Sequence, residues 1–338
     1  LGNAYAVASS AETTFNYIPK GYEIPADLDY FHITTKTGGF RLFKFGDETN
    51  MEAGDKWQLT CLDPTFTTPD WAKGAVIYQV FPDRFHKTGD CDLTGKLEPS
   101  TVHRNWYDEV DWRPTPGGLG LNNDFFGGNF RGITEKMDYI ADLGATIIYL
   151  NPIGKSFSNH RYDTGDYEKI DDFLGGEEAF DTLIREAHKR GIRIVLDGVF
   201  NHTGRDFFAF KDLQQNRENS PYKDWYCNVN FGGNNEYNDG FSYENWGGYD
   251  LLAKLNQRNP AVVNYICDVI RYWVKEFDID GLRLDAADVL DFNYMKALRN
   301  VANEVKPEFW LMGEVIHGNY SRWANEGTLH SVTNYMLH

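Results

Sequence analysis

Ionisable residues interrupt three segments that otherwise read as buried strands. Asp197 follows the apolar run IRIVL, Arg283 and Asp285 lie within GLRLDAAD, and Glu314 follows FWLMG. A buried parallel strand is normally a continuous apolar run. Charged groups where such strands end are therefore candidates for chemistry, with a purely structural ion pair as the alternative for any one of them.

Two carboxylates on neighbouring strand ends are suited to cleaving a glycosidic bond with retention. One carboxylate attacks the sugar carbon and the other protonates the leaving oxygen, at a separation of roughly 5–5.5 Å. We expect Asp285 to stay ionised, because Arg283 lies two residues away on the same strand face. We expect Glu314 to be the acid, with a pKa raised by the apolar residues before it and by the negative neighbour.

The elements that would position these residues alternate between strand and helix from residue 75 onward. Apolar periodicity predicts helices at 132–145, 177–191, 259–277 and 293–306. Apolar runs predict six strands, at 75–81, 146–154, 192–202, 281–288, 309–315 and 330–337. This order implies a parallel α/β sheet, and chemistry at the strand ends favours a TIM (β/α)8 barrel. A doubly wound sheet is the alternative, but no Gly-rich phosphate loop follows the first strand.

Two regions depart from this alternation. Residues 1–70 contain short strand-like segments (YFHITT, FRLFKF and KWQLTCL) and turn signals, which predict a small N-terminal β-domain and a linker. Residues 71–338 would then form the barrel. Residues 203–258 lie between the third strand and its helix, and a connection of that length predicts an inserted subdomain.

Composition limits the partners. The chain has 338 residues and a formal net charge of −17, so we expect neither nucleic acid nor an anionic membrane as a partner. No apolar run approaches the length of a membrane span. The first residues lack a cationic leader, and four cysteines lack metal spacing. Free thiols in a reducing compartment, and hence a cytoplasmic protein, are the expectation; a secreted protein without its leader is the alternative.

Several ordered motifs carry a resemblance to a known family. DGVFNHTG (197–204), GLRLDAAD (281–288) and LMGEV (311–315) resemble conserved regions of the α-amylase family, glycoside hydrolase family 13. WAKGAVIYQVFPDRF, NHRYDTGDY and LLAKLN are similar to segments of its cyclomaltodextrinase, neopullulanase and maltogenic amylase group. The resemblance covers roughly residues 28 to 338. It implies a retaining hydrolase of α-1,4-glucosidic bonds in maltooligosaccharides, cyclodextrins or starch-derived glucans.

The resemblance also implies a role for each site residue. Asp285 would be the nucleophile and Glu314 the acid/base. The substrate-binding residues would be Arg283, His202, Tyr162 and Asp197. Of these, Arg283 and His202 would contact the nucleophile and the sugar, Tyr162 would stack on that sugar, and Asp197 would support them from behind. A homodimer through the N-terminal β-domain is a further expectation.

A structural calcium ion is the one inorganic cofactor that the resemblance suggests, and no organic cofactor is expected. FFGGNFRGI (125–133) resembles a calcium-binding segment in which Asn129 takes an Asp position. The loop HKTGDCDLTG adds Asp90 and Asp92. Calcium prefers carboxylate and carbonyl oxygens, and a solvated acidic loop is the alternative.

The chain also departs from the group's pattern. Asp288 and Val289 stand where the group has Asn-Glu, and Ile316 stands where it has Trp; these positions bear on substrate preference. The family's His-Asp pair after strand seven has no counterpart in residues 1–338. We therefore expect a chain truncated after strand six that is not a competent glycosidase alone. A glucanotransferase or isomerase with the same intermediate, and a non-catalytic glucan-binding protein, are the alternative functions.

Overall fold

The computed structural model describes residues 66–96, 100–109 and 122–337, together with the backbone of four short strands nearer the N-terminus. The chain divides into two units, Leu1–Thr67 and Thr68–His338. In the first unit, β1 (Ala6–Val7) pairs with β2 (Thr14–Phe15), and β3 (Phe31–Thr35) pairs with β4 (Gly38–Leu42), both antiparallel. The strand predicted at KWQLTCL lies outside the described residues.

Six parallel strands form the central sheet of the second unit. They are β5 (Ile77–Val80), β8 (Ile147–Leu150), β11 (Arg193–Gly198), β15 (Gly281–Leu284), β16 (Trp310–Gly313) and β17 (Ser331–Val332). Each strand lies beside the one that follows it in this list. A doubly wound sheet would reverse its order at a switch point, so the sheet is the incomplete TIM barrel that the sequence predicts.

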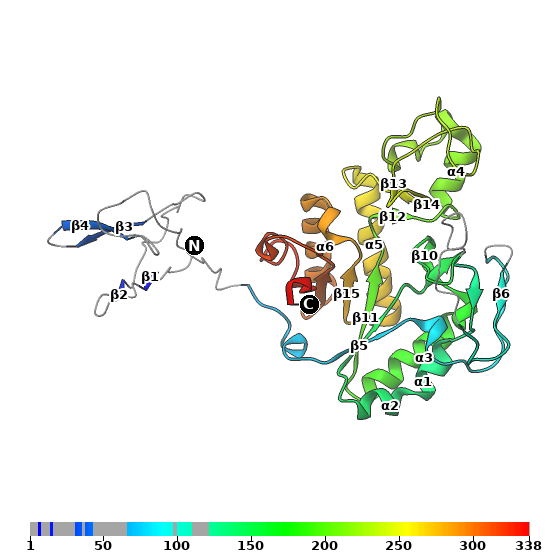
Figure 1. Cartoon of the computed structure of the whole chain (residues 1–338), viewed down its shortest axis with the longest axis horizontal. Helices are drawn as coiled ribbons and strands as arrows, with labels where there is room; N and C mark the ends of the chain where they lie inside the picture. The colour runs from blue at the N-terminus through cyan, green and yellow to red at the C-terminus, as the bar shows by residue number, and fades with distance from the viewer. Residues whose placement is uncertain are drawn as a thin grey trace. The chain divides into compact units, whose positions relative to one another are not determined.

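Five helices pack along this sheet (Figure 1). They are α1 (Phe130–Glu135), α2 (Met137–Asp142), α3 (Gly176–Lys189), α5 (Pro260–Phe277) and α6 (Phe292–Val305). The helix predicted at 132–145 is thus two short helices that meet at Lys136. Among the residues that the structure describes, no helix combines the length and apolar composition that a membrane crossing needs.

Capping residues explain where the longer helices begin. Asn259 caps α5 through the Ala261 N–H, and Pro260 occupies the first position, where its missing N–H costs nothing. Asp291 caps α6 through the N–H groups of Asn293 and Tyr294. Each cap comes directly before a segment that has apolar residues at helical spacing. That spacing determines which face of the helix packs against the sheet.

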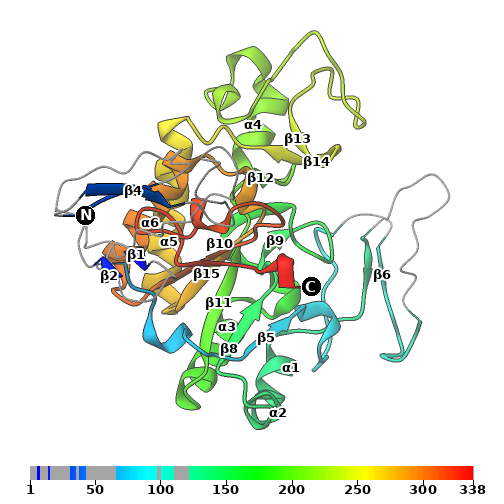
Figure 2. The same cartoon turned by 60° about the vertical axis from the view of Figure 1, so that its left-hand side comes forward.

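Residues 203–258 form a lobe at one end of the sheet (Figure 1 and Figure 2). The lobe contains α4 (Phe208–Asn216) and a small antiparallel sheet made of β12 (His202–Thr203), β14 (Tyr249–Lys254) and β13 (Asn245–Trp246). Buried aromatic rings fill it, among them Phe210, Tyr226, Phe241 and Tyr243. These rings continue the hydrophobic core of the sheet and its helices into the lobe, and β12 joins the lobe to the end of β11.

The remaining elements are short. A hairpin of β9 (Gly154–Ser156) and β10 (Thr164–Ile170) follows β8, and β6 (Thr101–Val102) pairs with β7 (Asp124–Phe125). Single 3₁₀ turns lie at Asp70–Ala72, Pro82–Arg84, Asp172–Leu174, Arg217–Asn219, Lys223–Trp225, Ala287–Val289, Tyr320–Arg322 and Tyr335–Leu337.

Strand register arranges side chains in levels across the sheet. Gln79, Tyr149, Val195, Gly281 and Trp310 share one level. Asp197, Arg283, Met312 and Ser331 share the level two residues further toward the strand ends. Residues two apart on a strand face the same side, so the charged level lies directly above a mostly apolar one.

Candidate active site

Arg283 bonds to carboxylates from three consecutive strands. Its Nη1 donates to Asp197 Oδ1 at 2.8 Å and to Asp285 Oδ1 at 3.0 Å. Its Nη2 lies 2.8 Å from Glu314 Oε2. Arg283 is 8% exposed, so the guanidinium is largely shielded from water. Parallel pairing of β11, β15 and β16 brings these strand ends together, and the predicted nucleophile and acid thus share one cation.

Burial and two neighbouring carboxylates set the protonation of Asp285. Burial, followed by the charge of Asp197, raises the pKa of Asp285 to about 7, with Glu314 adding to the effect and Arg283 opposing it. The sequence argument expected Arg283 to hold Asp285 ionised. The contact is present, but the net shift of the pKa has the opposite sign, because burial and the charges of Asp197 and Glu314 together outweigh the single guanidinium.

Asp197 lies deepest of the three carboxylates. Its side chain is fully buried, and its Oδ2 accepts hydrogen bonds from the Tyr149 hydroxyl at 2.6 Å and the Tyr162 hydroxyl at 2.8 Å. Burial raises the pKa of Asp197, while Arg283 and both phenols oppose that shift. Sequence reasoning missed Tyr149, although a phenol inside the aliphatic run TIIYL was a usable signal.

Glu314 is held by backbone and hydroxyl groups. Its Oε2 accepts the Ala286 N–H at 3.0 Å, and its Oε1 accepts the Tyr335 hydroxyl at 3.2 Å. Ala286 has a φ of 47°, a left-handed conformation that costs a non-glycine residue on the order of 1 kcal/mol or more. This strained turn directly follows Asp285 and aims the N–H of Ala286 at Glu314.

The apolar surroundings expected for Glu314 are only partly realised. Its side chain is 20% exposed. Trp310 and Met312 pack with Ile147 and Val195 on the inner face of the sheet. The immediate partners of the Glu314 carboxylate are therefore polar groups rather than the apolar run that precedes it.

His202 presents an unused polar atom. The residue is 1% exposed, its Nδ1 lies 3.3 Å from Asn201 Nδ2, and its Nε2 has no hydrogen-bond partner within the described part of the chain. Burial lowers its pKa to about 4, so the ring is neutral at pH 7. Buried polar atoms are normally bonded, and a ligand hydroxyl would satisfy this one.

Tyr162 is half-buried and bonds to the carboxylate of Asp197. Its hydroxyl donates to Asp197 and accepts from Asn151 Nδ2 at 3.2 Å. Asn151 in turn accepts from Gln79 Nε2 at 2.9 Å. A chain of hydrogen bonds thus runs from β5 to Asp197, which fixes the edge of the Tyr162 ring while part of the side chain stays accessible.

The residues predicted to bind calcium are used differently. The Asn129 amide donates to Thr88 O at 2.8 Å, and its oxygen caps the first turn of α1. The Asp92 carboxylate accepts from Thr94 N and Oγ1 at 2.9 and 2.7 Å, and Asp90 is exposed. Across residues 66–96, 100–109 and 122–337, no group of three or more acidic, His or Cys side chains could hold a metal. A calcium ion held by Asp90, Asp92 and Asn129 stays a prediction.

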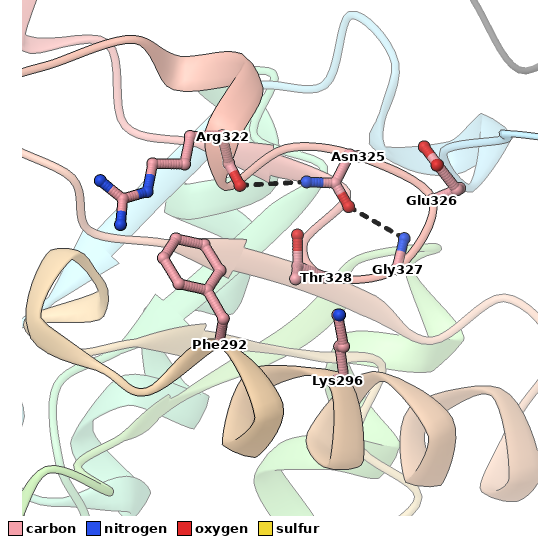
Figure 3. Close-up of a pocket in the computed structure, with 7 residues that line it drawn as sticks. All are labelled: Phe292, Lys296, Arg322, Asn325, Glu326, Gly327 and Thr328. Carbon is pink, nitrogen blue, oxygen red and sulfur yellow. Dashed lines mark hydrogen bonds between the residues drawn. The ribbon is translucent and has the colours of Figure 1, made fainter. Parts of the chain in front are cut away.

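A separate pocket of about 590 Å³ lies between α6 and the segment after β16. Phe292 and Lys296 rise into it from α6, facing Thr328 and Asn325 (Figure 3). The Arg322 guanidinium lies 4.7 Å from the centre of the Phe292 ring. None of the predicted site residues lines this pocket, so it is not part of the candidate active site.

Comparison with known proteins places these residues in context. Residues 79–338 match the model of the α-amylase catalytic domain. A cyclomaltodextrinase of Geobacillus thermopakistaniensis is 39% identical over 272 residues, which cover 80% of this chain and 43% of that protein. Neopullulanase 2 of Thermoactinomyces vulgaris is 39% identical over 343 residues, 100% of this chain and 56% of that protein. The chain spans about half the length of these curated relatives.

A solved structure agrees with the sequence matches. A cyclic α-maltosyl-(1→6)-maltose hydrolase from Arthrobacter globiformis aligns with a TM-score of 0.68 and 34% identity, over 80% of this chain and 57% of that one. The family model covers well over half of the chain and includes all three strand ends that carry the carboxylates. The chain therefore belongs to the α-amylase family.

Proposed function

We propose that the protein carrying this chain is a retaining glycoside hydrolase that cleaves α-1,4-glucosidic bonds in maltooligosaccharides, cyclodextrins or starch-derived glucans. One observation carries the proposal: Arg283 bonds to Asp285 and Glu314 at the same time. Both carboxylates therefore lie at neighbouring strand ends within reach of one guanidinium, an arrangement that favours the close spacing of a retaining pair.

In the first proposed step, an Asp285 carboxylate oxygen attacks the anomeric carbon. The bond between that carbon and the glycosidic oxygen breaks, and the leaving oxygen takes a proton from Glu314. A covalent glycosyl–Asp285 intermediate results. Because Asp285 must be ionised, and burial raises its pKa to about 7, we expect the active fraction of free protein to grow as the pH rises toward 7.

In the second step, Glu314 removes a proton from water, which attacks the same carbon from the face that the leaving group vacated. The C–O bond to Asp285 breaks, and Asp285 and Glu314 return to their starting protonation. His202 supports the binding role assigned to it, because its buried Nε2 can bond to a sugar hydroxyl. Tyr162 is half-buried, which is compatible with the stacking role proposed for it.

One assay distinguishes the proposed hydrolase from the two alternative functions. Intact protein is incubated with maltoheptaose, the first-formed anomer is followed by proton NMR, and the product lengths are determined. Shorter products that first appear in the α configuration support the proposal. Products longer than the substrate would indicate a glucanotransferase, and binding without turnover would indicate a glucan-binding protein. A β anomer formed first would refute the covalent mechanism.

Two further expectations belong with this proposal. The name of a Bacillus subtilis relative, intracellular maltogenic amylase, is consistent with a cytoplasmic location. Cys91, Cys227 and Cys267 are free thiols, which suits a reducing compartment, and Cys61 lies outside the described residues. A homodimer through the N-terminal β-domain stays a prediction, which sedimentation of the intact protein would test.

A further inference from the structure

Tyr149 brings a hydroxyl into an apolar level of the sheet. It lies on β8, is 6% exposed and packs with Val195 and Trp310 on the inner face. Register places it on the level below Asp197, which its hydroxyl reaches at 2.6 Å. A phenylalanine would fill the same volume, so the hydroxyl itself calls for an explanation, because a buried hydroxyl is costly unless it is bonded.

The hydrogen bond from the Tyr149 hydroxyl to Asp197 affects the orientation of Arg283. Asp197 Oδ2 accepts from Tyr149, from Tyr162 and from Arg283 Nη1, the last at 3.0 Å. The Arg283 guanidinium also lies 5.8 Å from the centre of the Tyr149 ring. Tyr149 thus contacts both the anion that anchors the guanidinium and the guanidinium itself.

Arg283 passes this restraint on to the two proposed catalytic groups. With Asp197 fixed from below by Tyr149, Nη1 is shared between Asp197 and Asp285, and Nη2 is directed at Glu314. A planar guanidinium has its donors in fixed directions. A tilt of Arg283 toward Asp197 would therefore change its bonds to Asp285 and Glu314 together.

We propose that Tyr149 is a positioning residue, whose hydroxyl sets the placement of Asp285 and Glu314 by way of Asp197 and Arg283. The proposal rests on the proposed glycosidase function for its kinetic consequence only. Tyr149 is too deeply buried to touch substrate, so its effect belongs in the chemical step rather than in binding.

The test deletes one oxygen atom. In Tyr149→Phe, Asp197 loses a donor and draws Arg283 Nη1 away from Asp285. We expect kcat to fall about 10- to 100-fold, as it does when a hydrogen-bonding partner that orients a metal ligand is removed, with KM little changed. We also expect the acidic limb of the kcat/KM profile to move to higher pH, because Asp285 keeps its proton longer.

Other groups face Asp285 and are unchanged in this variant. They are Arg283 from its own strand, Asp197 from β11, Glu314 after β16, Tyr162 before β10, Tyr167 on β10, and Tyr335 after β17. A shift of the acidic limb in Tyr149→Phe would therefore report the altered Arg283 bond, since no ionised group has been added or removed.

Tyr294→Phe is the matched control. Tyr294 is 1% exposed, and its hydroxyl donates to the backbone oxygen of Phe200 at 3.4 Å rather than to a carboxylate. Both variants lose one buried hydroxyl. Equal kinetic losses and equal pH profiles in Tyr149→Phe and Tyr294→Phe would overturn the positioning role and leave a packing role.

A measurement without substrate separates this inference from the proposed function. The melting temperature of each variant is recorded from pH 4 to pH 8, where Asp285 titrates. A change in the pH dependence confined to Tyr149→Phe supports the positioning role even if the protein turns over no glucan. Superimposable pH dependences for wild type, Tyr149→Phe and Tyr294→Phe would refute it.

Discussion

Two buried charge clusters in this chain have opposite ratios of bonded carboxylates to cations. The active-site cluster sets three carboxylates, Asp197, Asp285 and Glu314, around the single cation Arg283. In the Asp171 cluster two cations, Lys96 and Arg161, bond to one carboxylate, with Arg161 Nε 2.6 Å from Asp171 Oδ2. The buried carboxylates of Asp83 and Asp163 act on these cations electrostatically and are bonded to neither of them. Both lie within the second unit of the chain, and both are largely shielded from water.

In these two clusters the pKa of the carboxyl group is shifted in opposite directions. Burial raises the pKa of Asp285 to about 7, since the shared Arg283 cannot compensate for it. Burial also works against ionisation of Asp171, but Arg161 and Lys96 outweigh it and hold its pKa below the usual value. A structural cluster satisfies its buried charge, whereas an active-site cluster keeps a carboxylate close to its titration point.

Asp285→Asn should produce the largest effect on the active-site cluster. An amide cannot attack the anomeric carbon, so turnover of an activated α-glucoside should fall by about 10⁴-fold or more. Asp92→Asn, an exposed change in a turn, is the matched control and should keep full activity. Activity near the wild-type level in Asp285→Asn would show that the nucleophile lies elsewhere.

Glu314→Gln should come next. The amide cannot deliver a proton to the leaving oxygen, and loss of general acid catalysis costs typically 10²- to 10⁴-fold. α-Glucosyl fluoride needs little protonation when it leaves, so formation of the intermediate from it should be much less affected than from maltotriose. An equal loss with both substrates would indicate that Glu314 acts on structure rather than as the acid.

Asp171→Asn should give the largest stability effect. The change keeps the shape of the side chain but removes the one carboxylate to which the buried Lys96 and Arg161 both bond. Breaking a buried pair in this way costs about 3–5 kcal/mol of unfolding free energy, which urea denaturation would measure. A loss below about 1 kcal/mol would mean that water reaches the two cations and that the contrast between the clusters is wrong.

Asp285→Asn should have the opposite effect on stability. The folded protein binds the Asp285 proton up to about pH 7, whereas the unfolded chain releases it near pH 4, so ionisation costs folding free energy as pH rises through that window. Above pH 7 the unfolding free energy of the variant should exceed that of wild type by about 2–4 kcal/mol. At pH 4 the difference should vanish, and denaturation curves at both values check it.

The strand order and the meeting of the carboxylates were predictable from the sequence. Apolar runs locate the strands, and parallel pairing of consecutive strands brings Asp197, Arg283 and Glu314 to one end of the sheet. The sharing of one guanidinium among three carboxylates was not predictable, because it depends on side-chain directions that periodicity does not contain. The prediction that Arg283 keeps Asp285 ionised was therefore wrong in the direction of the pKa shift.

Local structure was harder to predict from the sequence. Asn129 precedes a helical segment and caps it through its side-chain oxygen, a role that the sequence analysis did not assign to it. The split of the helix predicted at 132–145 had no clear signal in the apolar pattern. Tyr149 had a signal, a polar group inside a buried strand, but its partner lies 48 residues away in sequence.

The smallest effect is expected from Lys96→Met, and it tests the excess of positive charge in the Asp171 cluster. Removing one of two cations leaves Arg161 paired with Asp171, so no buried charge loses its partner. The unfolding free energy at pH 7 should change by no more than about 1–2 kcal/mol, well below the loss expected for Asp171→Asn. A loss as large as that of Asp171→Asn would show that both cations are needed.

The pH dependence sharpens this last prediction. Burial, with Arg161 adding to it, lowers the pKa of Lys96 to about 8. The unfolded chain keeps that proton up to about pH 10.4, so wild-type stability should gain as the pH rises from about 8 to 10.4, because the unfolded state then binds more protons. Lys96→Met should lose this gain, whereas Lys189→Met, which removes an exposed ammonium, should keep it. Parallel stability curves for wild type and Lys96→Met across that window would mean that Lys96 titrates as a solvated lysine.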